Sequence, residues 1–375
     1  MGLKETLTLN LKNIPGGRTG RKLLVIECDD WGGIRMPSGD TYTRLQKDNV
    51  PFVKNRFNRY DTLADSEDLE RLFEVLRNVT DYKGRGAVMT AFTNVANPDF
   101  KKIRGSDFSE YSYEPFTETL KRYYIDSGTF DNWLEGLRQG IFVPELHGRE
   151  HISVQFWMMK LREGNFLARK AFDNEFAAIS IDGLVPVLDQ FRPEFYFDSQ
   201  DQIPFLKNSI KTAASLFEKL FGYKSRVFAP SNSVFHPWFE PDLLISGVQY
   251  LYVNTFNPVP NGKGRLKYHF YRNGKKSPSG LIYYTRNCAF EPTAPGYKGI
   301  DTTMKQIETA FRWNKPAKIS THRVNFIGRI NKDNRDKGLK ELQSLLSAVI
   351  RKWPDIEFLS SAQMLDEIYQ KHQYK

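Results

Sequence analysis

Two short segments of the chain carry side chains that could bind a metal ion. In the first, Asp29 and Asp30 follow an apolar run at residues 23–26, with two residues between. Adjacent carboxylates at the end of a predicted strand are unfavourable as core residues, because a buried charge has to be paired or bound to a metal. The alternative is a structural turn in which the two aspartates cap backbone groups.

A histidine pair forms the second segment. His147 and His151 follow another apolar run and are four residues apart. This spacing places two imidazoles on one face of a helical turn, where both can reach one cation. With six histidines in 375 residues, a pair at this spacing is expected by chance only about 0.1 times. The alternative is that both histidines have structural hydrogen-bond partners, or that they lie on a turn exposed to solvent.

Other polar residues follow further predicted strands. His322 comes directly after the strand predicted at residues 318–321, and Arg286 comes after the strand predicted at residues 281–285. Asn94 and Asn232 have similar positions and could shape a substrate pocket. Trp31 could offer a flat face for stacking against a ligand, although tryptophan is equally common in a core.

All these residues share a position relative to the strands that must hold them. Short apolar runs bounded by turn residues alternate with longer helical patterns, which is typical of βα units around a parallel sheet or barrel. The active site of such a barrel forms at the carboxyl ends of its strands, so we expect the site residues to meet there. Strands are predicted at residues 22–28, 87–93, 141–146, 226–229, 250–253, 281–285, 318–321 and 357–359.

Helical patterns occupy the intervals between the strands. Near the end of the chain, Leu339, Leu342, Leu345 and Leu346 recur at helical spacing, which indicates a core-facing stripe. We expect one domain over residues 1–375, with a helical insertion near 152–221 and an inserted loop near 257–280. Helices are predicted at residues 66–79, 116–139, 154–176, 204–221, 237–246, 302–313, 337–352 and 362–372.

Composition excludes several classes of protein. Hydrophobic residues make up 40% of the chain and aromatic residues 14%, which is enough for a core and excludes a disordered chain. The net charge of +10 is scattered along the sequence, a pattern that favours solubility over nucleic-acid binding. Cys28 and Cys288 are the only cysteines, so neither a disulfide framework nor a thiolate zinc site is expected.

The sequence has no sign of a membrane partner. No apolar stretch approaches the roughly 20 residues that a membrane span needs, and residues 1–20 lack the apolar segment of a signal peptide. We therefore expect a soluble, cytoplasmic protein. No feature indicates an oligomeric state.

The order of these segments resembles the polysaccharide deacetylases of carbohydrate esterase family 4. An Asp-Asp strand end, a His-x-x-x-His strand end, a proline-containing strand end and a late strand ending in histidine follow one another. The resemblance implies an α/β fold, a distorted (β/α)7-type barrel, and hydrolysis of an acylated saccharide or sugar intermediate. It also implies that Asp30, His147 and His151 bind one divalent cation, with Asp29 as general base and His322 as general acid.

The resemblance covers residues 22–372, with departures beside the aspartate pair. The family's usual threonine and phenylalanine before the pair are Glu27 and Cys28 here, and the glycine after it is Trp31. Zinc is the expected ion, and Co, Mn, Ni or Fe would also suit a carboxylate and two imidazoles.

A further departure concerns the substrate groove. Residues 227–231 are similar to the family's groove motif, which makes Ser231 a predicted substrate contact. The motif's arginine, which in the family pairs with the base aspartate, is Ala229 in this chain. We predict that Arg286, from a neighbouring strand, pairs with Asp29 instead.

Two other functions are compatible with the sequence. His147-x-x-Glu150-His151 also matches the inverted zinc-protease motif, in which the glutamate is the base. That motif requires a helix, which Gly148 disfavours, and it leaves the aspartate pair without a role. A carbohydrate-binding protein without turnover is the second possibility, because a fold does not determine a function, and the missing groove arginine favours it.

Overall fold

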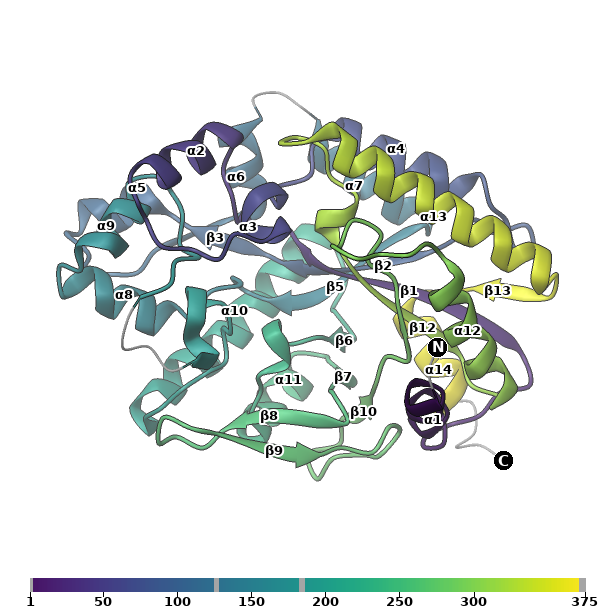
Figure 1. Ribbon diagram of the computed structural model, residues 1–375. Coiled ribbons are helices and arrows are strands. Elements are labelled where there is room, and N and C mark those ends of the chain that lie inside the picture. Colours follow the sequence, from purple (N-terminus) through teal and green to yellow (C-terminus); the bar gives the residue numbers. More distant parts are fainter. Residues whose placement is uncertain (1–2, 125–127, 182–185, 371–375) are drawn as a thin grey trace.

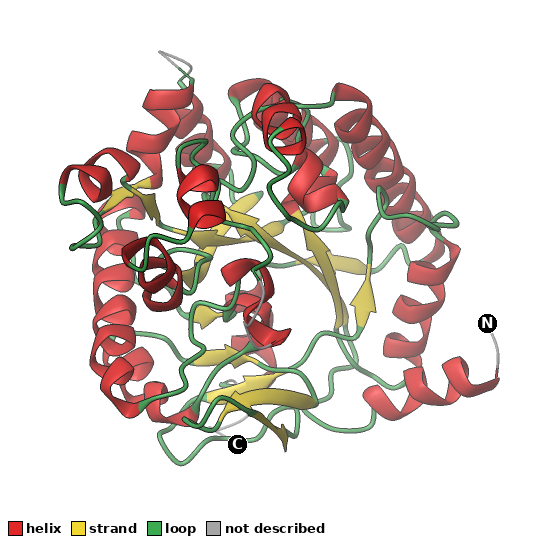
Figure 2. Cartoon of the chain, turned by 60° about the vertical axis from the view of Figure 1, so that its left-hand side comes forward, coloured by secondary structure: helices red, strands yellow, loops and turns green. Residues whose placement is uncertain are grey.

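The computed structural model of the chain describes residues 3–124, 128–181 and 186–370 (Figure 1). At its centre lies a curled sheet of nine strands, in which all the pairings between neighbouring strands are parallel. Helices lie around the outside of this sheet (Figure 2). The strands are β1 (Lys22–Trp31), β2 (Met89–Asn94), β5 (Phe142–Gly148), β6 (Val227–Phe228), β7 (Tyr250–Tyr252), β10 (Ile282–Tyr284), β11 (Cys288–Ala289), β12 (Ala317–His322) and β13 (Ile356–Phe358).

The two ends of the sheet are joined by one stretch of chain. The spatial order is β10-β7-β6-β5-β2-β1-β12-β11, and β13 pairs with the first residues of β1. β10 and β11 are therefore at opposite ends of the order, yet only residues 285–287 separate them in the sequence. We call residues 282–289 the seam segment, because its first part pairs with β7 and its last part with β12. This arrangement confirms the predicted barrel-like α/β fold.

β1 illustrates why the sequence forms a buried parallel strand. Leu23 and Val25 belong to the cluster of residues that fills the inside of the barrel. Leu24 and Ile26 belong to the larger cluster beneath the outer helices. Because side chains alternate along a strand and both faces are covered, the strand is apolar at every one of these positions.

The outer helices match the predicted pattern in most places. The stripe predicted near the end of the chain is buried on the longest of them, α13. The helices are α1 (Leu3–Lys12), α2 (Gly39–Lys47), α3 (Arg56–Tyr60), α4 (Ser66–Arg77), α5 (Phe100–Gly105), α6 (Phe116–Tyr123), α7 (Thr129–Arg138), α8 (Val154–Arg162), α9 (Phe166–Phe172), α10 (Ile203–Phe221), α11 (Glu240–Ile245), α12 (Asp301–Arg312), α13 (Lys332–Lys352) and α14 (Ser361–Tyr369).

Several predicted helices differ from the structure. The helix predicted at 116–139 is divided into α6 and α7, with residues 125–127 between them outside the described part. The helix predicted at 154–176 is also two, because Gly164 adopts a left-handed backbone and Asn165 then caps α9. Of the helix predicted at 362–372, residues 371–372 lie outside the described part.

The two predicted insertions have structure of their own. Within 152–221, α8 and α9 pack with α2 and α5 around a second apolar cluster, whereas α10 packs directly on β5 and is one of the barrel's outer helices. The stretch 257–280, expected to be a loop, contains most of an antiparallel hairpin. The small strands are β3 (Ala96–Pro98), β4 (Tyr113–Pro115), β8 (Phe256–Pro260) and β9 (Leu266–Phe270).

Across the described residues, no helix is both long enough and apolar enough to cross a membrane.

Candidate metal centre and catalytic site

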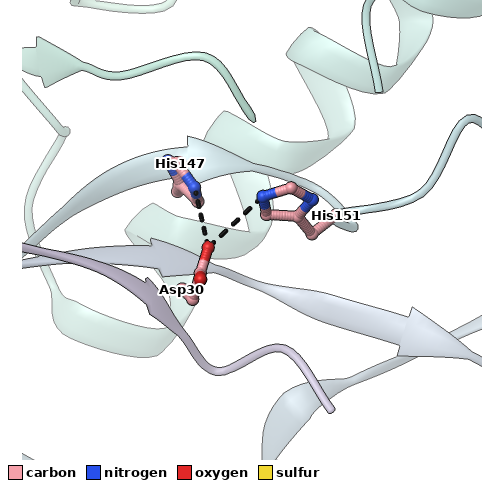
Figure 3. A group of neighbouring side chains, drawn as sticks. All are labelled: Asp30, His147 and His151. Carbon is pink, nitrogen blue, oxygen red and sulfur yellow. Dashed lines mark ion pairs between the residues drawn. The ribbon is translucent and has the colours of Figure 1, made fainter. Parts of the chain in front are cut away.

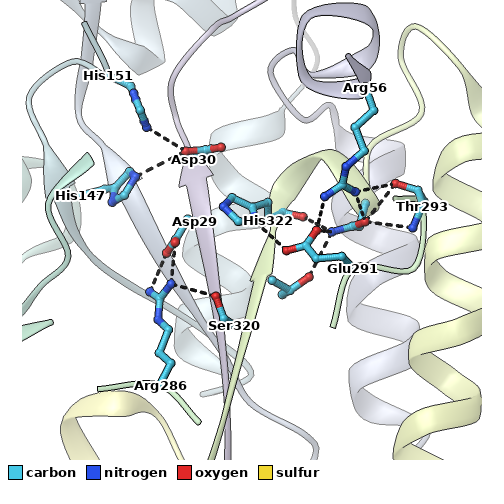
Figure 4. Close-up of polar contacts among 12 residues, drawn as sticks. Asp29, Asp30, Arg56, His147, His151, Arg286, Glu291, Thr293, Ser320 and His322 are labelled. Atoms are coloured by element: carbon cyan, nitrogen blue, oxygen red, sulfur yellow. Dashed lines mark hydrogen bonds and ion pairs between the residues drawn. The ribbon is translucent and has the colours of Figure 1, made fainter. Parts of the chain in front are cut away.

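The carboxyl ends of the barrel strands open into one cavity. It has a volume of about 860 Å³. Side chains from β1, β5, β12 and the seam segment meet on its floor (Figure 4). The predicted site residues that line this cavity are Asp29, Asp30, His147, His151, Asn232, Arg286 and His322.

A bulge at the end of β1 brings both aspartates into the cavity. Alternation along the strand would place Asp29 inside the barrel and turn Asp30 away from it. The pairing of β1 with β2 shifts register between Cys28 and Trp31, and Asp30 has a φ of 75°. Aspartate tolerates this left-handed backbone better than most residues, and a bulge re-aims the side chain. Two neighbouring residues therefore face the same cavity.

Asp30, His147 and His151 form a compact group (Figure 3). Asp30 Oδ1 lies 3.4 Å from His147 Nε2 and 3.3 Å from His151 Nε2. The three ligand atoms lie within 4.8 Å of one another. These separations exceed the roughly 2.7–2.9 Å of a charge-assisted hydrogen bond. They match ligand atoms about 3.4 Å apart, as on a tetrahedral ion with bonds of about 2.1 Å.

Backbone carbonyls orient both imidazoles. His147 Nδ1 lies 2.7 Å from the carbonyl oxygen of Ala229, and His151 Nδ1 lies 2.9 Å from that of Arg192. A ring that donates from Nδ1 presents the lone pair of Nε2, which is how metal-binding histidines are usually held. His147 Nε2 is buried and makes no hydrogen bond to any described residue. Ala229, which stands at the position of the family's groove arginine, thus orients the candidate ligand His147 through its backbone carbonyl.

The ionisation states also suit a metal site. Burial, together with the nearby charge of Arg192, lowers the pKa of His151 to about 3, so its ring is neutral at physiological pH. Burial alone would raise the pKa of Asp30, but contacts with His147 and His151 hold it well below its usual value. A neutral imidazole and an ionised carboxylate are the forms that bind a cation. The residues present therefore fit a divalent metal ion.

Arg286 pairs with Asp29 through two hydrogen bonds. Its Nη1 and Nη2 lie 2.6 and 2.7 Å from the two carboxylate oxygens of Asp29. Its Nε donates to Glu27 at 2.5 Å. Burial alone would raise the pKa of Asp29, but the Arg286 charge holds it below its usual value. Glu27 and Arg286, two departures from the family pattern, thus act together to orient Asp29.

His322 lies beside Asp29 and is held by an acidic partner. It faces Asp29 across the β1–β12 pairing, and its Nδ1 lies 2.6 Å from Glu291 Oε1. Arg56 and Asn325 bind the other oxygen of Glu291. Burial would lower the pKa of His322, but Glu291 raises it to about 9. His322 is therefore an imidazolium ion at neutral pH.

The fold of the chain is similar to that of several solved structures. No family model matches the sequence, and no curated protein does. A candidate glycoside hydrolase/deacetylase from Parabacteroides distasonis matches over 95% of this chain and 73% of its own, with 8% identity and a TM-score of 0.50. That match shows a shared fold. It confirms at the level of the fold the resemblance inferred from the motifs.

Two further structures are similar to the chain. A candidate polysaccharide deacetylase from Mycobacterium smegmatis matches over 96% of this chain and 95% of its own, with 10% identity and a TM-score of 0.45. The 4-alpha-glucanotransferase from Thermococcus litoralis matches over 92% of this chain with 11% identity and a TM-score of 0.46. The chain spans 40% of the length of the glucanotransferase.

Three residues predicted to contact substrate do not line the cavity. Trp31 is 1% exposed and packs edge-on against Trp133 and Phe142, because the bulge that admits Asp30 turns the next side chain back into the core. Ser231 is buried and accepts a hydrogen bond from the backbone of Glu194. Asn94 is buried beside a small void behind Asp30. The structure does not bring these three side chains to the cavity wall.

The histidine pair is not on a helix. His147 lies within β5, one residue before its end at Gly148, and residues 149–153 have no helical structure. Gly148 between them has a φ of 131°, and a Cβ there would meet Glu194 Oε2 at 2.0 Å. Glu150 points away and binds Tyr111 and Arg149. The helical turn expected for the pair is therefore wrong, and the inverted zinc-protease motif lacks its helix.

Sequence reasoning missed three charged residues of the site. Arg35 and Arg192 line the cavity, and Glu291 binds His322. Burial and repulsion from Arg35 lower the pKa of Arg192 to about 9. Glu291 follows β11, a strand of two residues that is too short to be predicted from the sequence. Its place after a strand is the only signal that could have pointed to Glu291. Arg192 lies in the irregular part of the 152–221 insertion, where no periodicity points to it.

Proposed function

We propose that this protein is a metal-dependent hydrolase that removes an acetyl or similar acyl group from an N- or O-acylated sugar. The convergence of Asp30, His147 and His151 carries the proposal. Asp30 Oδ1 lies 3.4 and 3.3 Å from the two imidazole nitrogens, as ligand atoms on one ion would, and all three atoms lie within 4.8 Å of one another. Zinc is the preferred ion for this ligand set, and Co, Mn, Ni or Fe would also fit.

The residues around the metal centre divide the proton transfers between them. A divalent cation held there supplies a Lewis acid for the acyl carbonyl and makes a nearby water more acidic. Asp29, ionised beside Arg286, accepts the proton of the water as its oxygen attacks the acyl carbon. His322 donates its proton to the leaving amine or alcohol as the bond to the acyl carbon breaks. The acid and the base thus lie on neighbouring strands, β12 and β1.

Acetate release is the direct test of this proposal. The purified protein is first analysed for metal content and then incubated with N-acetylated and O-acetylated sugars. Release of acetate that stops on chelation and returns on adding zinc is the expected result. A protein that retains the metal and binds sugars, but hydrolyses no amide or ester, would instead be a carbohydrate-binding protein on the same barrel.

Replacing Arg286 by lysine tests the positioning of the base. Lysine keeps the positive charge but cannot make both hydrogen bonds to Asp29. We expect turnover to fall by roughly 10- to 100-fold, because a displaced base is a poor acceptor. The pKa of Asp29 should rise toward its usual value, so the acid limb of kcat/KM moves to higher pH.

Arg226→Lys is the matched control, since Arg226 pairs with Asp366 at the amino end of β6, away from the cavity. A pH profile and turnover that stay unchanged in Arg286→Lys would remove Arg286 from the mechanism.

Replacing Glu291 by glutamine tests the acid. In the unmodified protein His322 loses its proton at about pH 9, so kcat/KM should fall as the pH rises through that value. Without the carboxylate, the pKa of His322 should approach the usual value of about 6.5. The alkaline limb should then move to lower pH, which a pH series of initial rates measures.

The control for this variant is Glu308→Gln, because Glu308 pairs with Lys352 on the outer helices. If the alkaline limb of Glu291→Gln coincides with that of the unmodified protein, His322 is not the group that titrates there.

A further inference from the structure

One buried arginine in the cavity has no acidic partner. Among the described residues, Arg192 is 8% exposed, its Nε makes no hydrogen bond, and no carboxylate oxygen lies within 4.0 Å of its guanidinium group. The other buried arginines all have such a partner: Arg149 with Glu150, Arg323 with Asp61, and Arg335 with Asp68. An unpaired buried cation is unfavourable, so its retention at a cavity wall suggests a partner that arrives with a ligand.

Arg35 brings a second positive charge to the same wall. Its Nε donates to Asn58 Oδ1 at 2.6 Å and one Nη donates to Gln190 Oε1 at 3.0 Å. Both acceptors are neutral amides, which orient the guanidinium group without compensating its charge. Asn58 is itself fixed by hydrogen bonds with Asn55 and Val53. Arg35 is thus held in place before any ligand binds.

The acidic groups near these two arginines are already engaged. Asp30 belongs to the candidate metal centre, and Asp61 accepts hydrogen bonds from Arg323 at 3.0 and 2.8 Å. Asp189 is exposed at the rim and accepts from Ser180 and Gln190. A divalent cation at the metal centre would add further positive charge. This side of the cavity therefore has an excess of positive charge that water alone compensates poorly.

We propose that the acylated substrate carries a carboxylate or phosphate group, which Arg35 and Arg192 bind beside His151. The inference rests on the proposed function, and it names the substrate class of that site. A planar guanidinium group matches both anions in geometry, because it donates paired N–H groups to two oxygens. Asn232, also on the cavity wall, is free to contact the neutral part of the sugar.

Binding measurements with three probes test the inference without requiring turnover. Calorimetric titration of the metal-loaded protein compares N-acetylglucosamine, its 6-phosphate and the corresponding 6-carboxylate, N-acetylglucosaminuronic acid. We expect the anionic probes to bind roughly 10- to 100-fold more tightly than the neutral sugar, since each charged hydrogen bond strengthens binding. The phosphate and carboxylate arms identify which anion is preferred.

Two variants assign that preference to the arginines. Arg192→Gln and Arg35→Gln should each reduce it at least about 10-fold, whereas Arg351→Gln, which removes an exposed charge from the end of α13, should leave it unchanged. A preference that survives both cavity variants would come from the metal alone and would overturn the inference. Equal affinity for all three probes in the unmodified protein would overturn it as well.

Thermal unfolding separates a ligand-binding arginine from a structural one. Because Arg192 has no acidic partner in the free protein, we expect Arg192→Gln to raise Tm by about 1–3 °C. A marked fall in Tm with an unchanged preference would make Arg192 a structural support. Anion preference without acetate release would contradict the proposed hydrolysis alone. Equal turnover of neutral and anionic sugars would contradict this inference alone.

Discussion

Replacing His147 by alanine is expected to abolish retention of the divalent cation and, with it, hydrolysis. His147 supplies a buried Nε2 that makes no hydrogen bond to any described residue. Its removal therefore deletes a candidate ligand, together with the single hydrogen bond between Nδ1 and the Ala229 carbonyl. Loss of a group that only orients a metal ligand typically weakens metal binding by about 10- to 100-fold. The loss of a ligand should exceed that, and a missing Lewis acid slows hydrolysis by more than about 1,000-fold.

Metal analysis of the purified variant and acetate release measure the two effects. His269→Ala is the matched control, because His269 is exposed on β9 and lies outside the metal centre. The imidazole lost is the same in both variants. If His147→Ala kept a full equivalent of metal and normal turnover, the metal centre described above would be wrong.

Asparagine in place of Asp29 is expected to lower turnover while the metal stays bound. The side chain keeps its shape but can no longer accept a proton, and removal of a general base costs about 100- to 10,000-fold. Asp29 is not one of the three grouped ligands. Metal content and substrate affinity should therefore change little, so kcat falls far more than KM rises.

Asp198→Asn provides the comparison, because Asp198 is an exposed aspartate that does not line the cavity. Loss of metal from Asp29→Asn would make Asp29 a ligand. Unchanged turnover would mean that another group accepts the proton of the attacking water.

Much of the barrel was predictable because its strands are buried on both faces. Runs such as residues 23–26 have no room for polar side chains, and their ends mark where polar residues reach the cavity. The helices were less predictable. Residues 116–139 were predicted as one helix from their apolar pattern, although Asp126, Ser127 and Gly128 are a cluster of turn-type residues just before α7 begins.

Site residues were predictable only where they follow an apolar run in the sequence, because such a run marks the end of a strand. Asp30, His147 and His151 follow apolar runs, so strand ends were enough to group them. The bulge that turns Asp30 inward is a backbone feature without a sequence signature here. Arg35 and Arg192 come from irregular segments that meet only after folding. Their proximity depends on tertiary structure, which no local pattern encodes.

The seam segment links the integrity of the barrel to its chemistry. The same short stretch bonds to β7 and β12 and carries Arg286, which orients the base. Suppose that local unfolding separates this stretch from β7 or from β12. The guanidinium group would then move away from Asp29, even if every other strand stayed paired. Inactivation in mild denaturant should thus precede the cooperative loss of helical structure.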